Sequence, residues 1–161
     1  MKRELFVIAL SIMICSLAGC GTESRAEQSA FKTTFSLGSI VEVNEQLLLP
    51  GPRISGGSEA GPTEPFTQAS EVMTVQIDAT NVLAFMEGIQ SGIQESLVSS
   101  GAELLGGGGS ASQDPTGHLS DPVYFSFSYR EGEVFGTINV WGVPGQGSSL
   151  VLIVTIVEGQ V

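Results

Sequence analysis

The sequence predicts a single domain of the α+β class: a mostly antiparallel sheet of about five strands with one amphipathic helix packed on one face. Three patterns support this class. Apolar and polar residues alternate at 123–141, they alternate again at 72–79, and an apolar stripe of helical spacing begins at Val82. Strands that both precede and follow one helix favour an α+β arrangement over repeated strand–helix–strand units.

The first part of the domain, 31–70, predicts strands followed by a loop. Apolar residues alternate before the run Leu47-Leu48-Leu49, and we expect one or two strands there. The alternating positions are Phe35, Leu37, Val41 and Val43. From about 50 to 70 the chain is rich in glycine and proline, which is typical of a mobile surface loop.

A strand at 72–79 leads into the predicted helix, which Thr80 or Asn81 can cap. The helix should end near Ser100-Gly101. Its apolar stripe consists of Val82, Phe85, Met86, Ile89, Ile93 and Leu97. Gly88 and Gly92 leave bare patches near one side, where another backbone could approach closely, or the glycines are merely tolerated. The four glycines 106–109 suggest a linker, and we expect a mobile loop over 106–121.

A hairpin is predicted at 123–141, turning at Glu131-Gly132. Counting outward from that turn predicts four cross-strand pairs: Arg130 with Glu133, Tyr129 with Val134, Phe127 with Gly136, and Phe125 with Ile138. A large ring then covers a glycine that has no side chain. The following run, 150–157, is apolar on both sides except at Thr155, so we expect it to be central in the sheet.

One face of this predicted sheet carries apolar side chains that the helix does not cover. They include Tyr124, Phe135 and Trp141, together with Val151 and Ile153. Either the N-terminal strands cover this face, or it binds a partner protein. Monomers rarely expose a large apolar patch, which favours coverage by the chain itself.

The first twenty residues have the pattern of an export signal. Lys2 and Arg3 precede an apolar run from Leu5 to Ala18, which is shorter than the roughly twenty residues that a membrane-spanning helix needs. The run ends in Leu17-Ala18-Gly19-Cys20, a tetrapeptide that resembles the lipobox of bacterial lipoproteins.

This resemblance implies cleavage between Gly19 and Cys20 by the dedicated signal peptidase, and a covalent lipid on the Cys20 thiol. Residues 1–19 are then the signal peptide, 20–30 a lipidated tether and 31–161 the domain. Two or three acyl chains hold a protein firmly on a membrane, whereas one does not. In bacteria with two membranes, a residue other than Asp after the cysteine accompanies sorting to the outer membrane, and Gly21 fits this pattern.

Charge limits the partners of the domain. The chain carries 17 acidic and 6 basic residues, and losing Lys2, Arg3 and Glu4 with the signal takes the net charge from −11 to −12. Nucleic acid is excluded as an expected partner, because phosphate binding relies on clustered cations. Anionic headgroups should also repel the domain, so the lipid is expected to be its only attachment to the membrane.

The sequence contains no catalytic constellation, and we expect neither an enzyme nor a cofactor beyond the covalent lipid. His118 is the only histidine, and no serine lies in a strand–turn–helix elbow. The weak candidates for a metal site are Asp114, His118 and Asp121, in a stretch that more often forms a polar surface loop. Glycines 106–109 formally fit a dinucleotide fingerprint, but they follow a helix instead of a strand.

The sequence therefore predicts a membrane-anchored lipoprotein of the bacterial cell envelope, with a binding or structural role. The alternative is a membrane-tethered hydrolase or a ligand- or metal-binding protein that uses Asp114, His118 and Asp121. The His118→Ala substitution separates the two, because only the alternative predicts a loss of function.

Overall fold

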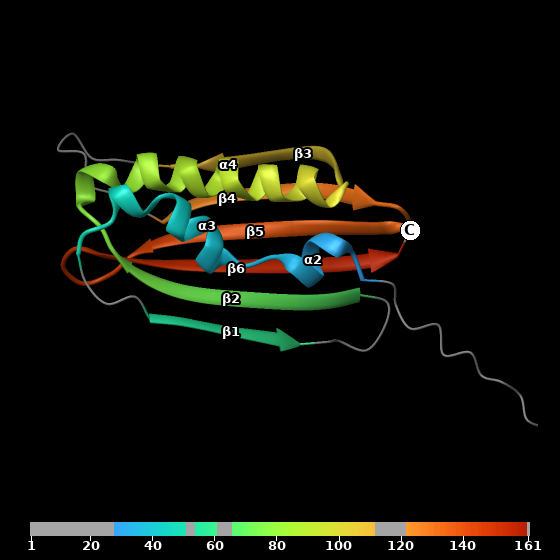
Figure 1. Ribbon diagram of the computed structural model, residues 1–161, viewed down its shortest axis with the longest axis horizontal. Helices are drawn as coiled ribbons and strands as arrows, with labels where there is room; N and C mark the ends of the chain where they lie inside the picture. The colour runs from blue at the N-terminus through green and yellow to red at the C-terminus, as the bar shows by residue number, and fades with distance from the viewer. Residues whose placement is uncertain (1–27, 51–53, 61–65, 112–121, 161) are drawn as a thin grey trace, which may run out of the picture.

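A six-stranded antiparallel sheet and one long helix dominate the computed structural model, which describes residues 28–50, 54–60, 66–111 and 122–160 (Figure 1). This confirms the α+β class. The strands are β1 (Ile54–Ala60), β2 (Phe66–Gln76), β3 (Glu103–Ser110), β4 (Val123–Glu131), β5 (Val134–Pro144) and β6 (Ser149–Gln160). They lie side by side in the order β1-β2-β6-β5-β4-β3.

The C-terminal half of the sheet follows the sequence pattern. The strand β6 pairs with both β2 and β5, so the prediction of a central strand is confirmed. The β4–β5 hairpin also forms, but its turn is Gly132-Glu133 instead of Glu131-Gly132. Glycine supplies the positive φ of 61° at the first turn residue, where a tight two-residue hairpin turn requires it.

This turn moves the predicted hairpin register by two residues, so the four predicted pairs are wrong although every side chain keeps its predicted face. Tyr129, not Phe127, lies opposite Gly136, and its ring occupies the space that a Cβ atom would need there. Arg130 lies opposite Phe135 and forms its ion pair with Glu103 of β3, with 2.9 Å between Nη2 and Oε2.

The prediction of strands at 31–49 is wrong, because this segment forms short helices. They are α2 (Ala30–Thr34), α3 (Leu37–Val43) and the 3-10 turn η1 (Glu45–Leu47). The alternation misled because the buried positions Leu37, Ile40 and Val41 have the three- and four-residue spacing of a helix. Leu48 forms an isolated β-bridge with Ile77, and Leu49 N donates to the Gln76 carbonyl of β2 at 2.8 Å.

Two segments predicted as loops contain strands. In the stretch 50–70, β1 pairs over its whole length with β2, which begins at Phe66. The four glycines 106–109, predicted as a linker, lie in β3 and pair with β4. Glycine composition predicts turns from local preference, whereas pairing with a neighbouring strand holds these segments extended.

The long helix α4 (Val82–Ser100) begins and ends near the predicted positions. Asn81 precedes it without a capping bond from its side chain, and Asp78 instead caps the preceding turn η2 (Ala79–Asn81) by accepting from Thr80 N at 2.9 Å. At its C-terminal end, Gly101 adopts a left-handed conformation with φ of 89°.

Side chains, and not another backbone, lie close against the two helix glycines. A Cβ atom at Gly92 would lie 2.7 Å from Cγ2 of Ile40, and one at Gly88 would overlap Asn44. Thus α3 and the residue after it pack directly against α4.

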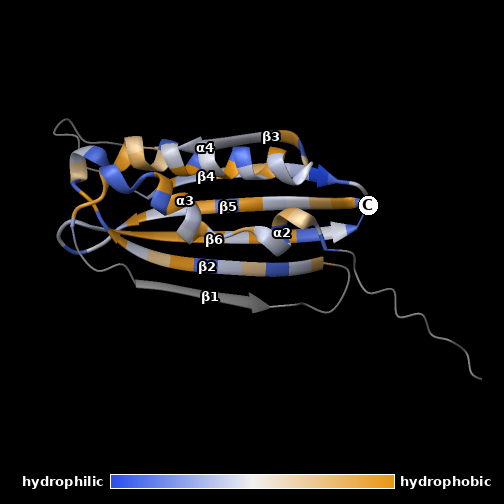
Figure 2. Ribbon diagram, in the orientation of Figure 1, coloured by the Kyte–Doolittle hydropathy of each residue, from blue (hydrophilic) through white to orange (hydrophobic). Residues whose placement is uncertain are grey.

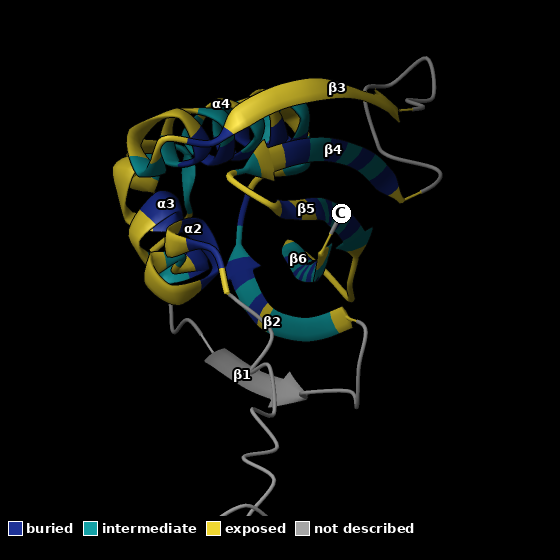
Figure 3. Ribbon diagram, turned by 90° about the vertical axis from the view of Figure 1, so that its right-hand side faces the viewer, coloured by how far each residue is buried: buried dark blue, intermediate teal, exposed yellow. Residues whose placement is uncertain are grey.

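The buried side chains form one core. The apolar stripe of α4 is buried together with Phe31 and Leu37 from the N-terminal helices and with alternate residues of β2, β4, β5 and β6. In Figure 2 apolar residues dominate β5 and β6 and alternate with polar residues around α4. Figure 3 shows the three α-helices within the curve of the sheet.

The opposite side of the sheet is partly exposed. Val151 and Ile153 alternate with the buried residues of β6 and lie on this outer side, as predicted. The idea that N-terminal strands cover it is wrong for the part of the chain described, since residues 30–47 form helices that join the core. Among all the residues that the structure describes, no helix has both the length and the apolar composition to cross a membrane.

Candidate functional site: a groove beside a free strand edge

A groove runs between α4 and the edge strand β3. It consists of two hollows of about 290 and 280 Å³ that share Gln90 as a lining residue. One lies beside Gly109, Ser110 and Ala111, and the other lies beside Gly106, Gly107 and Gly108. Successive parts of one strand thus line successive hollows.

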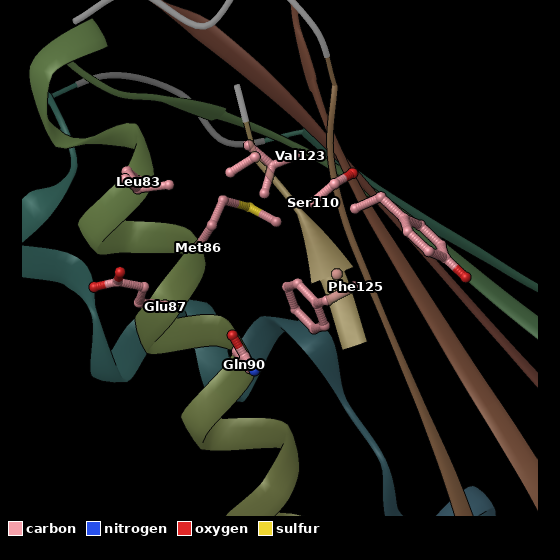
Figure 4. A pocket seen from close by; sticks show the side chains of 10 residues that line it. Leu83, Met86, Glu87, Gln90, Ser110, Val123 and Phe125 are labelled. Carbon is pink, nitrogen blue, oxygen red and sulfur yellow. The ribbon is translucent and has the colours of Figure 1, made fainter. Parts of the chain in front are cut away.

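The floor of the groove is apolar and its rim is polar. Figure 4 shows Met86, Val123 and Phe125 pointing into the first hollow, with Glu87 and Gln90 at its side. Phe127 and Leu104 line the second hollow, together with Gln94. The floor residues Met86, Val123 and Phe125 are almost fully buried. The amides at the rim supply hydrogen-bond donors and acceptors without charge.

The glycines of β3 let atoms of β4 lie directly against its backbone. Gly107 and Gly109 are required where they stand, since a Cβ atom there would lie 2.7 Å from Cδ1 of Phe127 and 2.8 Å from Cβ of Phe125. A Cβ atom at Gly106 or Gly108 would meet nothing within 4 Å. The strand therefore forms a wall of bare backbone between the groove and solvent.

That backbone has one free edge in the part of the chain described. The strand β3 is last in the sheet order and pairs only with β4, and all of its residues are exposed. Every second residue of an edge strand points its N–H and C=O groups away from the sheet. The site thus combines an apolar groove with a row of backbone donors and acceptors.

The residues predicted as a partner face lie on the outer side of the sheet, in two places. The rings of Tyr124 and Trp141 lie opposite each other on β4 and β5, with centroids 5.2 Å apart, and the Tyr124 hydroxyl donates to Oδ1 of Asn139 at 3.0 Å. Phe135 is exposed on the same side but six residues along β5 from Trp141, which is about 20 Å in an extended strand. The structure brings Tyr124 and Trp141 together and leaves Phe135 apart.

The other predicted site residues lie outside the part of the chain described. These are Gly19 and Cys20 of the lipobox, and Asp114, His118 and Asp121 of the weak metal candidate. Within the described ranges, no group of three or more histidine, cysteine, aspartate or glutamate residues could hold a metal ion.

A buried polar cluster around Glu158 was missed by the sequence interpretation. The Glu158 carboxylate on β6 is buried; it accepts from the Tyr129 hydroxyl at 2.5 Å and from the Ser29 hydroxyl. Ser29 also caps α2, because its Oγ accepts from Lys32 N at 3.0 Å. The Lys32 ammonium in turn donates to Oγ1 of Thr67 on β2 at 2.6 Å.

This cluster fastens the N-terminal helix to the sheet. Glu131 adds to it by accepting from the backbone N–H of Ala30 at 2.9 Å, at the positive end of α2. Phe31 packs its ring edge-on against Tyr129, with centroids 5.3 Å apart. Ser29 is buried and its hydroxyl serves both as the cap of α2 and as a donor to Glu158, so its role in this cluster is structural.

Burial raises the pKa of Tyr129 far above its usual value near 10, and the hydrogen bond to Glu158 and the negative charge of that carboxylate raise it further. The folded protein therefore keeps this proton while the unfolded chain loses it above about pH 10. Since the unfolded state then binds fewer protons, the free energy of unfolding should fall as the pH rises above about 10. Below that pH, the ionisation of Tyr129 should not make the free energy of unfolding depend on pH.

A Tyr124→Phe variant tests this expectation, because Tyr129 is then the only tyrosine left in the chain. Tyrosinate absorbance should rise only together with the loss of the circular dichroism of the fold. Formation of tyrosinate at about pH 10 in a protein that is still folded would contradict the burial of Tyr129.

Comparisons with known proteins do not assign a family. No family model matches the chain, and no curated protein matches it. A solved thioesterase family protein from Silicibacter pomeroyi is similar over 78% of this chain and 99% of its own, with 7% sequence identity and a TM-score of 0.26. A likeness at this level carries no argument about fold or activity.

Proposed function

We propose that this protein is a lipid-anchored component of the bacterial cell envelope that binds another envelope protein and has no enzymatic activity. The lipid on Cys20 attaches the protein to a membrane, on the periplasmic face of the outer membrane where the organism has one. In this proposal α4 packs on one face of the sheet and forms one wall of the binding groove.

The observation that carries the binding role is the groove between α4 and β3, which adjoins a free strand edge. A groove with an apolar floor and convergent polar groups is the usual form of a binding site. Natural proteins usually protect long sheet edges, so a bare one supports a partner that completes it. The strong negative charge favours a partner with basic residues.

A photo-crosslinking amino acid at Gln90 tests the site in intact cells. Gln90 lines both hollows, whereas its neighbour Ser91 is exposed on α4 and lines neither. We expect a defined crosslinked product from position 90 in the membrane fraction and none from position 91. Equal products from both positions, or none from either, would contradict binding in the groove.

The same experiment at Trp141 examines the outer side of the sheet. Crosslinks from position 141 alone would move the partner site to Tyr124 and Trp141. In that case Trp141→Glu should abolish the product while the protein stays folded. Loss of folding would instead mean that the ring is needed for the stability of the domain.

A further inference from the structure

We infer that the ligand of the groove is an extended, basic peptide that joins the sheet as a seventh strand, along Gly106–Ser110 of β3. This inference rests on the proposed function for the place of the site and adds the chemical class of the ligand. It is carried by the backbone edge, by the spacing of the two hollows and by the charge of the chain.

The backbone edge selects a peptide. A free edge presents N–H and C=O groups in alternation, and the main chain of an added strand satisfies both, which is the established mode of β-strand addition. Edge strands are usually protected by charged side chains, prolines or bulges. In β3 these devices stand at one end only, at the charged Glu103 and at the bulge between Leu104 and Gly106. The segment from Gly106 to Ser110 has none.

The hollows select the side chains. Side chains of an added strand alternate between the two sides of the sheet, so those on the α4 side recur at every second residue. The hollow beside Gly106–Gly108 and the hollow beside Gly109–Ala111 therefore accept consecutive members of that set. Accessible apolar side chains line both hollows: the exposed Leu104 and Leu105 at one, and the half-buried Leu83 at the other. We expect β-branched or other apolar residues at these two positions.

Charge selects a basic peptide. The chain has a net charge of −11, and the exposed Glu87 stands on the rim of the first hollow. Opposite charge accelerates encounter and disfavours acidic competitors. We therefore expect lysine or arginine at the positions of the peptide that do not enter the groove.

A second copy of this chain fits the same edge less well. Pairing β3 with its own copy would bring together two strongly acidic domains. It would also place glycines 106–109 of the copy opposite the hollows, with no side chains to fill them. The apolar volume of the groove thus favours a ligand whose sequence differs from that of β3.

The test uses the full lipidated protein in detergent and a labelled peptide, Lys-Val-Thr-Val-Thr-Val-Lys, acetylated and amidated at its ends. Fluorescence anisotropy should show saturable binding that weakens with added salt. Replacing both lysines of the peptide by glutamate should weaken binding by about tenfold or more. Gln90→Trp, which fills the groove, should have a similar effect, while Ser91→Trp should bind as the unchanged protein does.

Backbone methylation of the peptide separates strand addition from side-chain binding. Methylating alternate amide nitrogens removes the donors of one edge of the peptide and leaves the other edge intact. Two peptides are compared, each methylated at one of the two sets of alternate amides. One of them should not bind, and the other should bind as the unmethylated peptide does. If both methylated peptides bind equally, or the unmodified peptide does not bind, the inference is wrong.

Self-association is the remaining outcome. If Gln90→Trp converts a dimer in detergent to a monomer and no peptide binds, the edge is closed by a second copy and the inference is overturned. Failure of the peptide together with crosslinks from Gln90 in cells would remove the peptide class but keep the proposed function. Peptide binding without such crosslinks in cells would keep the peptide class of the ligand and remove the proposed function.

Discussion

Replacing Cys20 with serine should release the domain from the membrane fraction, or leave it there with its signal uncleaved. In the proposed function the lipid on the Cys20 thiol is the only attachment, since a domain of net charge −12 is repelled by anionic headgroups. Two or three acyl chains contribute about 0.8 kcal/mol for each buried methylene, so their loss is expected to change partition almost completely.

Cell fractionation with labelled palmitate measures this effect. The unchanged protein should incorporate the label and sediment with membranes. The Cys15→Ser variant is the matched control, because it alters the only other cysteine and should behave as the unchanged protein does. A Cys20→Ser protein that is processed to the mature size and still sediments with membranes would show that something other than the lipid attaches the domain.

Sheet structure could be predicted where the side chains alternate strictly. The strands β4 and β5 were predicted because apolar and polar residues alternate along them, and their burial has the same period of two. The strand β6 was predicted from a run that is apolar on both sides. The register of the hairpin missed by two residues, because Glu131-Gly132 and Gly132-Glu133 fit the sequence equally well until the φ angle at Gly132 is known. An even shift keeps every face, so the core was predicted even where the pairing was not.

Glycine-rich segments could not be predicted in the same way. Gly107 and Gly109 lie in a strand because β3 pairs with β4, and atoms of Phe127 and Phe125 leave no room there for a Cβ atom. That reason is tertiary, and the local composition points to a linker instead. The candidate groove was missed for the same reason, since bare backbone and the spaces between α4 and β3 form much of it.

The position of Glu158 contained a signal that the sequence interpretation did not use. Continuing the alternation of β6 beyond Ile156 places Glu158 on the buried side, where an acidic residue needs hydrogen-bond donors. Tyr129 is inward by the same count on β4, and it is a donor. The pairing with Ser29 could not have been inferred, because Ser29 was predicted to lie in the tether 20–30, outside the domain.

The Glu158→Ala substitution should destabilise the domain by about 2 to 6 kcal/mol, because it removes the acceptor of two buried hydroxyls. It leaves the hydroxyls of Tyr129 and Ser29 buried without their common acceptor, and each such group costs about 1 to 3 kcal/mol. Glu158→Gln retains one acceptor oxygen and should cost less. Urea unfolding at neutral pH measures these differences.

Hydrogen exchange shows whether the loss has the predicted cause. Because the cluster fastens α2, the amides of Ala30–Thr34 should lose protection in Glu158→Ala at denaturant-free conditions, before those of β5 and β6. The double variant Glu158→Ala with Tyr129→Phe should lose less stability than the two single variants lose together. The reason is that the phenylalanine no longer needs an acceptor. Strict additivity, or a Glu158→Ala protein as stable as the unchanged one, would mean that Glu158 does not hold α2 on the sheet.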